Sequence, residues 1–330
     1  YHNRPSCNSM TSLTEREIIC ILTKQFARQL RPLLGFNDDV SAIPLSSKTW
    51  IIVKTDMLVG STDIPPGMTI QEAGRKAVVA AVSDFAAKGV QPTALMVSLG
   101  LPGPVARKTV QNIAFGLSQA AREYHCKIIG GDTNQADDLV IDVAGVGVAN
   151  PKKLVRRDGA RVGDVVAVTG PFGNPAAGLR ILMSREKKKL ANHTSLVNAV
   201  LRPKARLTEG IILAKSGGVT SSIDSSDGLA WSLHQIARAS LVGINLHTIP
   251  VAPAAQSFAK ERRISAIELA LYGGEEYELL VTVAPNRFSS LKKRVPSLKR
   301  IGIVEKGSEV VAHLDGRRIQ VEERGWEHFR

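Results

Sequence analysis

The sequence is poor in cysteine and aromatic residues, and it contains no long apolar run. The three cysteines, Cys7, Cys20 and Cys126, form no CxxC pair, which argues against a zinc site or disulfide framework and predicts reduced thiols in the cytoplasm. No apolar run approaches the ~20 residues that span a bilayer, and no apolar targeting segment stands near the start, so no membrane association is expected. Cys20 and Cys126 fall on apolar helical patterns and are predicted to be small core residues.

Aromatic residues make up 5% of the 330 residues, and the basic residues are not interleaved with them. The net charge of +13 comes from 43 Lys and Arg against 30 Asp and Glu, scattered in short clusters. A solvated basic surface accounts for this charge, and nucleic acid is not expected as a partner. A non-catalytic, metal-dependent nucleotide or nucleic-acid binder remains the alternative from another functional class.

The familiar nucleotide and metal motifs are also missing. The sequence has no GxxxxGK[ST], no HRD or DFG set and no HExxH, and "GVGVAN" breaks the GxGxxG pattern inside an apolar strand. "TGPFGNPAAGL", residues 169–179, combines a strand end, a glycine turn and the start of a helix of small residues. Such a turn either cradles a phosphate with its N–H groups or has a purely structural role, and the pattern leaves both open.

Strands and helices alternate along the chain, and some neighbouring strands are predicted to be antiparallel. The fold class is therefore α/β (α+β) in two domains. We expect a flexible tail over residues 1–13, an N-terminal domain over 14–150 and a C-terminal α/β domain over 151–330. The capping-box spacing of Thr14 and Glu17 predicts a helix that reaches about Arg31. Further helices are predicted over 70–88, 106–124, 175–186, 194–216 and 286–296, and a short strand that breaks into a glycine turn over 127–133.

Aspartates stand at turns and strand ends rather than only on solvated faces, at positions 38, 39, 56, 132, 224 and 227. Asp84 falls on the apolar face of its own helix, three residues after Ala81 and seven after Ala77, where an unpaired carboxylate is costly. Acids at such places are commonly helix caps. So many in one chain favour instead a magnesium site for a phosphorylated substrate, assembled from both domains.

Seven segments resemble the thiamine-monophosphate kinase family, in that family's order and spacing. They are "NDD" at 37–39, "KTDMLV" at 54–59, "AAVSDFAAKGVQP" at 80–92, "GGDT" at 130–133, "TGPFGNPAAGL" at 169–179, "IDSSDGLA" at 223–230 and "GGEEYELL" at 273–280. The resemblance implies an enzyme that uses ATP and Mg²⁺ to convert thiamine monophosphate to thiamine diphosphate. It also implies the fold of aminoimidazole ribonucleotide synthetase, in which an N-terminal mixed sheet forms a barrel in a homodimer and a C-terminal α/β domain completes the active site.

The same resemblance implies the site residues. The metal ligands it implies are Asp38, Asp56, Asp84, Asp132, Asp224 and Asp227, with Thr55 and the backbone carbonyl of Lys54 as weaker candidates. The ATP contacts it implies are Gly131, Asp132, Arg157 and Ser226, and the thiamine contacts are Glu275 and Trp326. Asp63 stands where many bacterial members carry a substrate-contacting histidine, and it is taken as a third substrate residue. Asp84, Asp132 and Asp227 are expected at the catalytic centre.

The expected reaction is direct, in-line phosphoryl transfer. A phosphate oxygen of thiamine monophosphate is ionised near neutral pH, so no strong general base is needed, and catalysis rests on positioning and charge neutralisation. The alternative within the fold is another ATP-dependent enzyme of the aminoimidazole ribonucleotide synthetase type.

Overall fold

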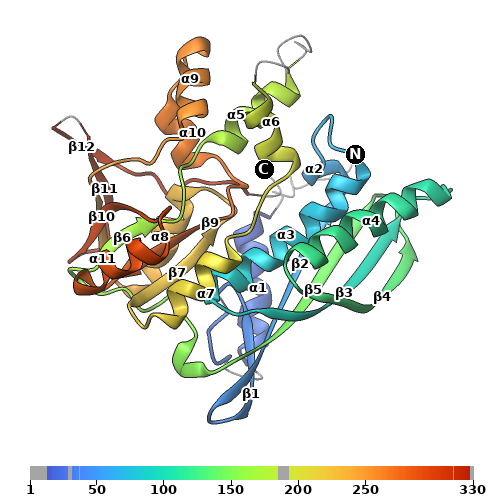
Figure 1. Ribbon diagram of the computed structural model, residues 1–330, viewed down its shortest axis with the longest axis horizontal. Coiled ribbons are helices and arrows are strands. Elements are labelled where there is room, and N and C mark those ends of the chain that lie inside the picture. Colours follow the sequence, from blue (N-terminus) through green and yellow to red (C-terminus); the bar gives the residue numbers. More distant parts are fainter. Residues whose placement is uncertain (1–12, 29–31, 37, 185–192, 315, 328–330) are drawn as a thin grey trace, which may run out of the picture.

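The computed structural model describes residues 13–28, 32–36, 38–184, 193–314 and 316–327. Within these ranges the chain forms a five-stranded sheet and then a seven-stranded sheet, each packed against helices (Figure 1). Cys7 and nearly all of the predicted tail lie outside the described residues. The helices in the described ranges include none long and apolar enough to cross a membrane. The cytoplasmic location stays a prediction.

The first sheet has the strand order β1-β2-β5-β3-β4, in which β3 and β4 are parallel and the other pairs antiparallel. Two helices, α3 and α4, cover one of its faces (Figure 1). The bounds are Ser41–Ser46 for β1, Thr49–Val59 for β2, Pro92–Leu101 for β3, Lys127–Gln135 for β4, Val140–Ala149 for β5, Ile70–Lys88 for α3 and Arg107–Glu123 for α4. A single turn of helix, α2 (Gly60–Asp63), follows β2.

Helix α3 lies between the first sheet and the second half of the chain (Figure 1). A capping box on Thr69 starts it, and Gly89 ends it in the left-handed conformation with φ 67°. A Cβ at Gly89 would lie 2.1 Å from the Cβ of Ala214 on α7 (Leu207–Lys215), so only glycine permits this close approach. As a result the last turns of α3 are buried on all sides, and their polar side chains face the junction of the two halves.

The chain leaves the first sheet at Ala149 and enters the second at Val165, through the short 3₁₀ helix η1 (Pro151–Lys153). The second sheet has the order β12-β11-β8-β10-β6-β9-β7. Its strands are Val165–Val168 for β6, Val219–Ser225 for β7, Gly243–Leu246 for β8, Glu278–Val283 for β9, Lys299–Glu305 for β10, Val310–Leu314 for β11 and Arg317–Gln320 for β12. The mixed sheets confirm the predicted fold class, whereas the domain boundary at residue 150 stays a prediction.

The predicted helices of the second half are present except at one place, and two further helices, Pro253–Arg262 and Ala266–Tyr272, were not predicted. The segment predicted as one helix over 194–216 forms α6 (Thr194–Leu201) and α7, because Pro203 lacks the N–H that a continuous helix needs. The remaining helices are α5 (Asn174–Met183), α8 (Leu229–Ser240), α9 (Pro253–Arg262), α10 (Ala266–Tyr272) and α11 (Pro285–Arg294).

Two predictions for the N-terminal half need correction. Helix α1 starts after its Thr14 capping box as predicted, but it spans Glu15–Phe26 and has no buried residue, so Cys20 is exposed while Cys126 is buried. The segment 127–133 does not break into a turn. It continues as strand β4 to Gln135, because Gly131 allows the backbone to approach that of Val97, where a Cβ would lie 1.8 Å from the carbonyl oxygen.

Candidate active site

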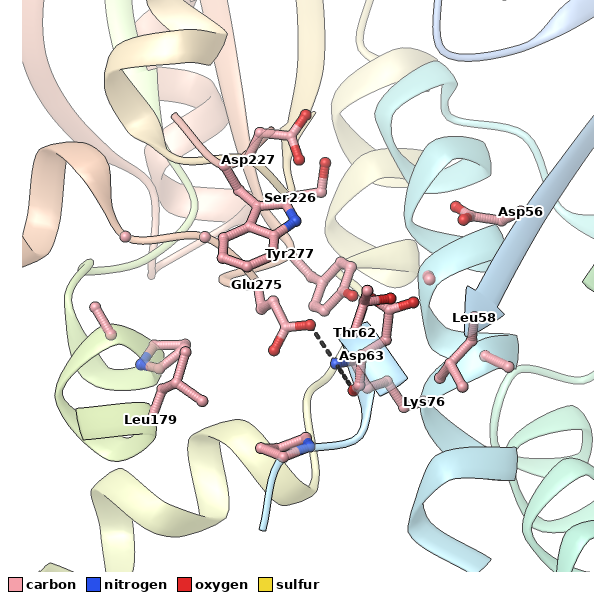
Figure 2. Close-up of a pocket in the computed structure, with 18 of the residues that line it drawn as sticks. Asp56, Leu58, Thr62, Asp63, Lys76, Leu179, Ser226, Asp227, Glu275 and Tyr277 are labelled. Carbon is pink, nitrogen blue, oxygen red and sulfur yellow. Dashed lines mark hydrogen bonds and ion pairs between the residues drawn. The ribbon is translucent and has the colours of Figure 1, made fainter. Parts of the chain in front are cut away.

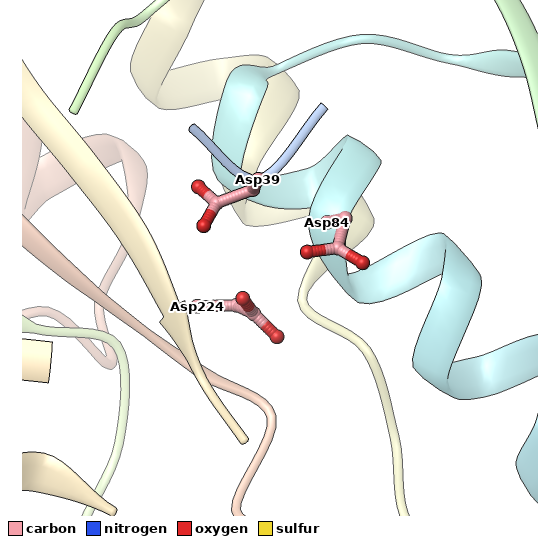
Figure 3. Close-up of side chains that lie close together, drawn as sticks. All are labelled: Asp39, Asp84 and Asp224. Atoms are coloured by element: carbon pink, nitrogen blue, oxygen red, sulfur yellow. The ribbon is translucent and has the colours of Figure 1, made fainter. Parts of the chain in front are cut away.

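Three buried acids from separate segments meet where the two halves of the chain join. Asp84 comes from α3, Asp224 from β7, and Asp39 from the turn before β1 (Figure 3). Each offers a carboxylate oxygen within 4.8 Å of those of the other two, and in the part of the chain that the structure describes these are the residues with such a grouping. We call Asp39, Asp84 and Asp224 the acid cluster.

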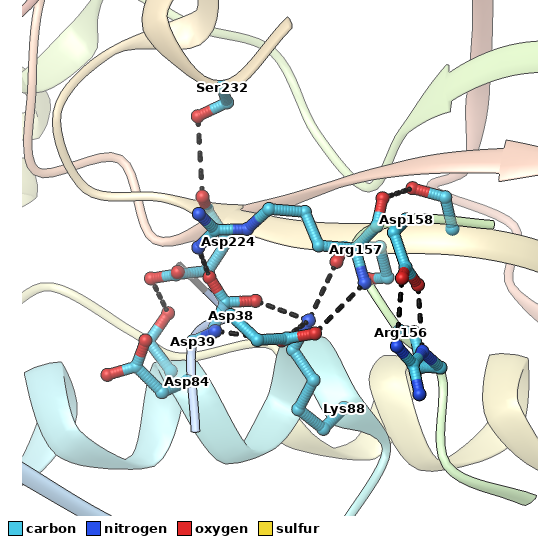
Figure 4. Close-up of polar contacts among 12 residues, drawn as sticks. Asp38, Asp39, Asp84, Lys88, Arg156, Arg157, Asp158, Asp224 and Ser232 are labelled. Carbon is cyan, nitrogen blue, oxygen red and sulfur yellow. Dashed lines mark hydrogen bonds and ion pairs between the residues drawn. The ribbon is translucent and has the colours of Figure 1, made fainter. Parts of the chain in front are cut away.

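Two basic residues balance Asp39. Lys88 Nζ lies 2.5 Å from Asp39 Oδ2, and Arg157 forms a second ion pair with the same carboxylate (Figure 4). Burial raises the pKa of Asp39, but the charges of Lys88 and Arg157 outweigh it and hold the pKa below its usual value. Asp39 is therefore ionised in the folded protein.

The charges of the other acids around the cluster are less fully balanced. Burial, followed by repulsion from neighbouring carboxylates, raises the pKa of Asp224 to about 6 and the pKa of Asp227 to about 7. Burial also raises the pKa of Asp84 well above its usual value, against the opposing charge of Lys54. These oxygens are hard donors in a region short of positive charge, which is the donor set that suits a divalent cation such as Mg²⁺.

Asp38, expected to be a metal ligand, lies outside the acid cluster, whereas the adjacent Asp39 is part of it, and the role of Asp38 stays a prediction. The Asp38 carboxylate accepts from Lys88 Nζ at 2.6 Å and from the Arg157 backbone N–H at 3.2 Å (Figure 4). Both acids belong to the segment "NDD", so the sequence pointed to a segment that contributes to the acid cluster. Which of two adjacent side chains faces the cluster depends on Lys88 and Arg157, more than 40 residues away.

The polar side chains of β2 lie on both faces of the first sheet, because successive side chains of a strand point to opposite faces. Thr55 Oγ1 donates to Asp142 Oδ1 at 2.7 Å on the face away from the helices. Lys54 and Asp56 point to the other face, where Lys54 Nζ lies 2.9 Å from Asp84 Oδ2. Asp142 was missed from the sequence, because it stands inside an apolar strand with no motif around it.

Gly131 and Asp132 lie apart from the acid cluster. Both belong to β4, the edge strand, and strands β3 and β5 separate β4 from β2. Three strand spacings of about 4.8 Å put Asp132 roughly 14 Å from Asp56. Within one chain, therefore, the acid of "GGDT" does not join the other predicted ligands.

A cavity of about 510 Å³ opens beside the acid cluster and contains the predicted thiamine residues. Glu275, Asp63 and Lys76 line it (Figure 2), and Trp326 lines it as well. Lys76 is nearly buried and forms an ion pair with Glu275, and its Nζ also donates to the Asp63 carbonyl at 2.8 Å. The Asp63 carboxylate accepts from the Val59 N–H at 2.7 Å, so part of its role is to hold the end of β2.

The walls of this cavity are tied to Ser226 and Asp227 by backbone hydrogen bonds. The N–H of Glu275 donates to the Ser226 carbonyl at 2.5 Å, and the N–H of Trp326 donates to the Asp227 carbonyl at 3.0 Å. A Cβ at Gly274 would lie 2.7 Å from the Ser226 carbonyl oxygen, which explains a glycine there. Glu275 and Trp326 are thus held beside Ser226 and Asp227 through the backbone.

A second cavity, of about 580 Å³, lies on the other side of the same acids. It contains the acid cluster, Arg157 and one side of α1, including Ile19 and Cys20. Five residues line both cavities: Glu15, Lys54, Ser226, Asp227 and Trp326. The two cavities therefore meet at Lys54, Ser226 and Asp227, so ligands in the two could react there.

Comparison with known proteins shows the family of this chain. Residues 37–149 match the family described as "AIR synthase related protein, N-terminal domain", and residues 161–315 match "AIR synthase related protein, C-terminal domain". A thiamine-monophosphate kinase of Nitrosopumilus maritimus is 38% identical over 97% of this chain and 100% of its own length. One of Pyrococcus abyssi is 37% identical over 97% of both. The chain belongs to the thiamine-monophosphate kinase family.

The fold agrees with that of a solved thiamine-monophosphate kinase. The structure described as "AaThiL complexed with AMPPCP and TMP" superposes with a TM-score of 0.87 at 29% identity, over 98% of this chain and 100% of the other. The family membership inferred from the seven segments is thus confirmed. It favours the thiamine-monophosphate kinase prediction over the aminoimidazole ribonucleotide synthetase alternative and over the non-catalytic binder.

Proposed function

We propose that this chain transfers the γ-phosphoryl group of ATP to thiamine monophosphate, forming thiamine diphosphate, with Mg²⁺ as the metal. The observation that carries the proposal is the meeting of two cavities at Lys54, Ser226 and Asp227, directly beside the acid cluster. The cavity with Arg157 suits ATP, and the cavity with Trp326 and Glu275 suits the thiamine part. The related structure with both AMPPCP and TMP supports two ligands side by side.

The side chains of the chain act mainly by positioning. Arg157 and Ser226 hold ATP from the second cavity, and Glu275 and Trp326 hold the cationic thiazolium ring from the first, by charge and by a cation–π contact. The acceptor oxygen of thiamine monophosphate is already ionised near neutral pH, so the transfer requires alignment rather than a strong general base. In agreement with this, no histidine among the described residues lines either cavity.

The residues that would hold Mg²⁺ are Asp39, Asp84 and Asp224, with Asp56 and Asp227 beside them. Burial is the main cause of the raised pKa values of Asp56, Asp84, Asp224 and Asp227, and repulsion between neighbouring carboxylates adds to it, so a bound cation would favour the charged carboxylates. When bound, Mg²⁺ would neutralise phosphate oxygens and so favour in-line transfer.

We also propose a homodimer built on the first sheet. The β1 pairing of β2 ends at Val53. Among the residues that the structure describes, no strand therefore pairs with this edge of β2 from residue 54 to residue 59 or with the outer edge of β4. Met57, Met96 and Val148 are exposed on the uncovered face of the same sheet. Unpaired strand edges and exposed apolar faces are both typical of surfaces that bind another chain.

Pairing β4 of one copy with the free edge of β2 in the other would close a barrel. It would also bring the partner's Asp132 beside Thr55 and Asp56, which explains how an acid roughly 14 Å away in its own chain can serve a metal site. Thr55 and Asp142 already face this side of the sheet.

The test is purified protein with ATP, Mg²⁺ and thiamine monophosphate, scored for thiamine diphosphate by chromatography. Asp84→Asn and Asp227→Asn are expected to reduce kcat by about 100-fold or more, because each removes charge from the transfer point. Glu309→Gln is the matched control. It changes an exposed acid directly before β11 that lines neither cavity, and it should keep full activity. Folded, ATP-binding protein that forms no product would overturn the thiamine assignment.

A further inference from the structure

Lys54 places a positive charge among the acids of the junction. Its Nζ lies 2.9 Å from Asp84 Oδ2 and 4.0 Å from Asp56 Oδ2, and its side chain is 26% exposed. The ammonium group thus stands between two carboxylates that come from different elements, β2 and α3. Sequence reasoning considered only the backbone carbonyl of this residue, as a weak metal ligand.

Lys54 differs from the other basic residues near the cluster. Lys88 is fully buried against Asp38 and Asp39 and lines neither cavity, and Arg157 lines only the second cavity. Lys76 and Arg180 line only the first. Among the described basic residues, Lys54 is the one that lines both cavities, at the place where the proposed donor and acceptor meet.

An ammonium group between two carboxylates does what a bridging divalent cation does at the same place. It offsets the repulsion between the two acids, and its three N–H groups reach several oxygens at once. Unlike an ion, it is attached to the chain and carries one charge rather than two. Asp84 has a second oxygen for the acid cluster, so the two arrangements are compatible.

We propose that the Lys54 ammonium takes the place of one divalent cation between Asp56 and Asp84, and supplies a fixed positive charge to the phosphoryl group in transit. The proposal rests on the proposed function for the identity of the transferred group. The expected number of bound metal ions does not rest on the proposed function. A chain with Lys54 binds one divalent ion fewer than the same chain without that ammonium group.

The test is the number of Mn²⁺ ions bound per chain, with a non-hydrolysable ATP analogue present, measured by the electron paramagnetic resonance signal of free Mn²⁺. Lys54→Met removes the charge and keeps the length, Lys54→Arg keeps the charge, and Lys48→Met removes an exposed charge from the β1–β2 turn. We expect one additional ion for Lys54→Met, and the wild-type number for the other two. An unchanged number in folded Lys54→Met protein would overturn the proposal.

A kinetic measurement separates the two proposals. Lys54→Met is expected to reduce kcat by about 100-fold at low Mg²⁺ and to regain much of it at high Mg²⁺, while Lys48→Met follows the wild-type Mg²⁺ curve. Loss of activity that no Mg²⁺ concentration restores, together with an unchanged ion number, would show that Lys54 is not a cation substitute. Absence of thiamine diphosphate from the wild-type protein would contradict the proposed function and leave the ion number as an independent result.

Discussion

Lys88 Nζ lies 2.5 Å from Asp39 Oδ2, and neither side chain is more than 2% exposed. The pair joins the last turn of α3 to the turn before β1, and Lys88 Nζ also donates to the Ser222 carbonyl of β7 at 2.9 Å. One side chain thus connects three segments that carry the acid cluster. Because the pair is buried, its partners depend on each other for stability as well as for position.

Lys88→Met is expected to destabilise the protein by about 3–5 kcal/mol, because it leaves Asp38 and Asp39 buried without their shared cation. The free energy of unfolding from urea titration measures this. Lys48→Met, which changes an exposed lysine, should stay within about 0.5 kcal/mol of the wild type. Equal stability of the two variants would mean that Lys88 is not needed to hold the acids.

Trp326→Ala is expected to raise the KM for thiamine monophosphate about tenfold, because a cation–π contact with the thiazolium ring is lost. The KM for ATP should change less, because Trp326 lines both cavities but the cationic ring that it is proposed to contact would occupy only the first. Steady-state kinetics with each substrate varied in turn measure both constants. Trp50→Phe, a change outside both cavities, is the control, and a larger effect on ATP than on thiamine monophosphate would contradict the assignment of the cavities.

Subunit complementation tests the proposed position of Asp132. Asp84→Asn and Asp132→Asn chains should each be inactive alone. If the partner's Asp132 completes the site, a mixed dimer has one intact site, and an equal mixture recovers about a quarter of wild-type activity by random assortment of a two-fold dimer. An active mixture requires refolding or co-expression so that subunits exchange. No recovery in mixed dimers would place Asp132 in its own chain's site or outside any site.

The pKa values of Asp224 and Asp227 make a prediction for the metal-free protein. Both values are raised above 3.8, to about 6 and about 7, so the stability they contribute is present below pH 3.8 and is lost as the pH rises through 6 and 7. Mg²⁺ binds the deprotonated carboxylates. The rise in Tm on adding MgCl₂ should therefore be larger at pH 8 than at pH 5.5.

NaCl at equal ionic strength controls for screening in that experiment, and Asp224→Asn should reduce the Mg²⁺ effect at pH 8. A Tm rise that is independent of pH would mean that neither Asp224 nor Asp227 takes part in binding the ion.

Much of the fold could be predicted from the sequence, because it is encoded locally. The period of Ala73, Ala77 and Ala81 placed a helix over 70–88, which is the range that α3 occupies. The Thr14 capping box marked the start of α1 for the same reason: the residues that satisfy the first N–H groups are neighbours in the chain. The segments that carry the acid cluster were also recognisable, since they place acids at a turn, on an apolar helix face and at a strand end.

What the sequence by itself determined is therefore most of the helices and strands, the fold class and the family. The tertiary structure decided which atoms meet. It placed Asp39 rather than Asp38 in the acid cluster, directed the ammonium of Lys54 to Asp84, and kept Asp132 on an edge strand away from the other acids. Each of these depends on partners from distant segments, and side-chain direction within a turn or strand is set by such long-range charge pairing and strand register rather than by the residues next to it.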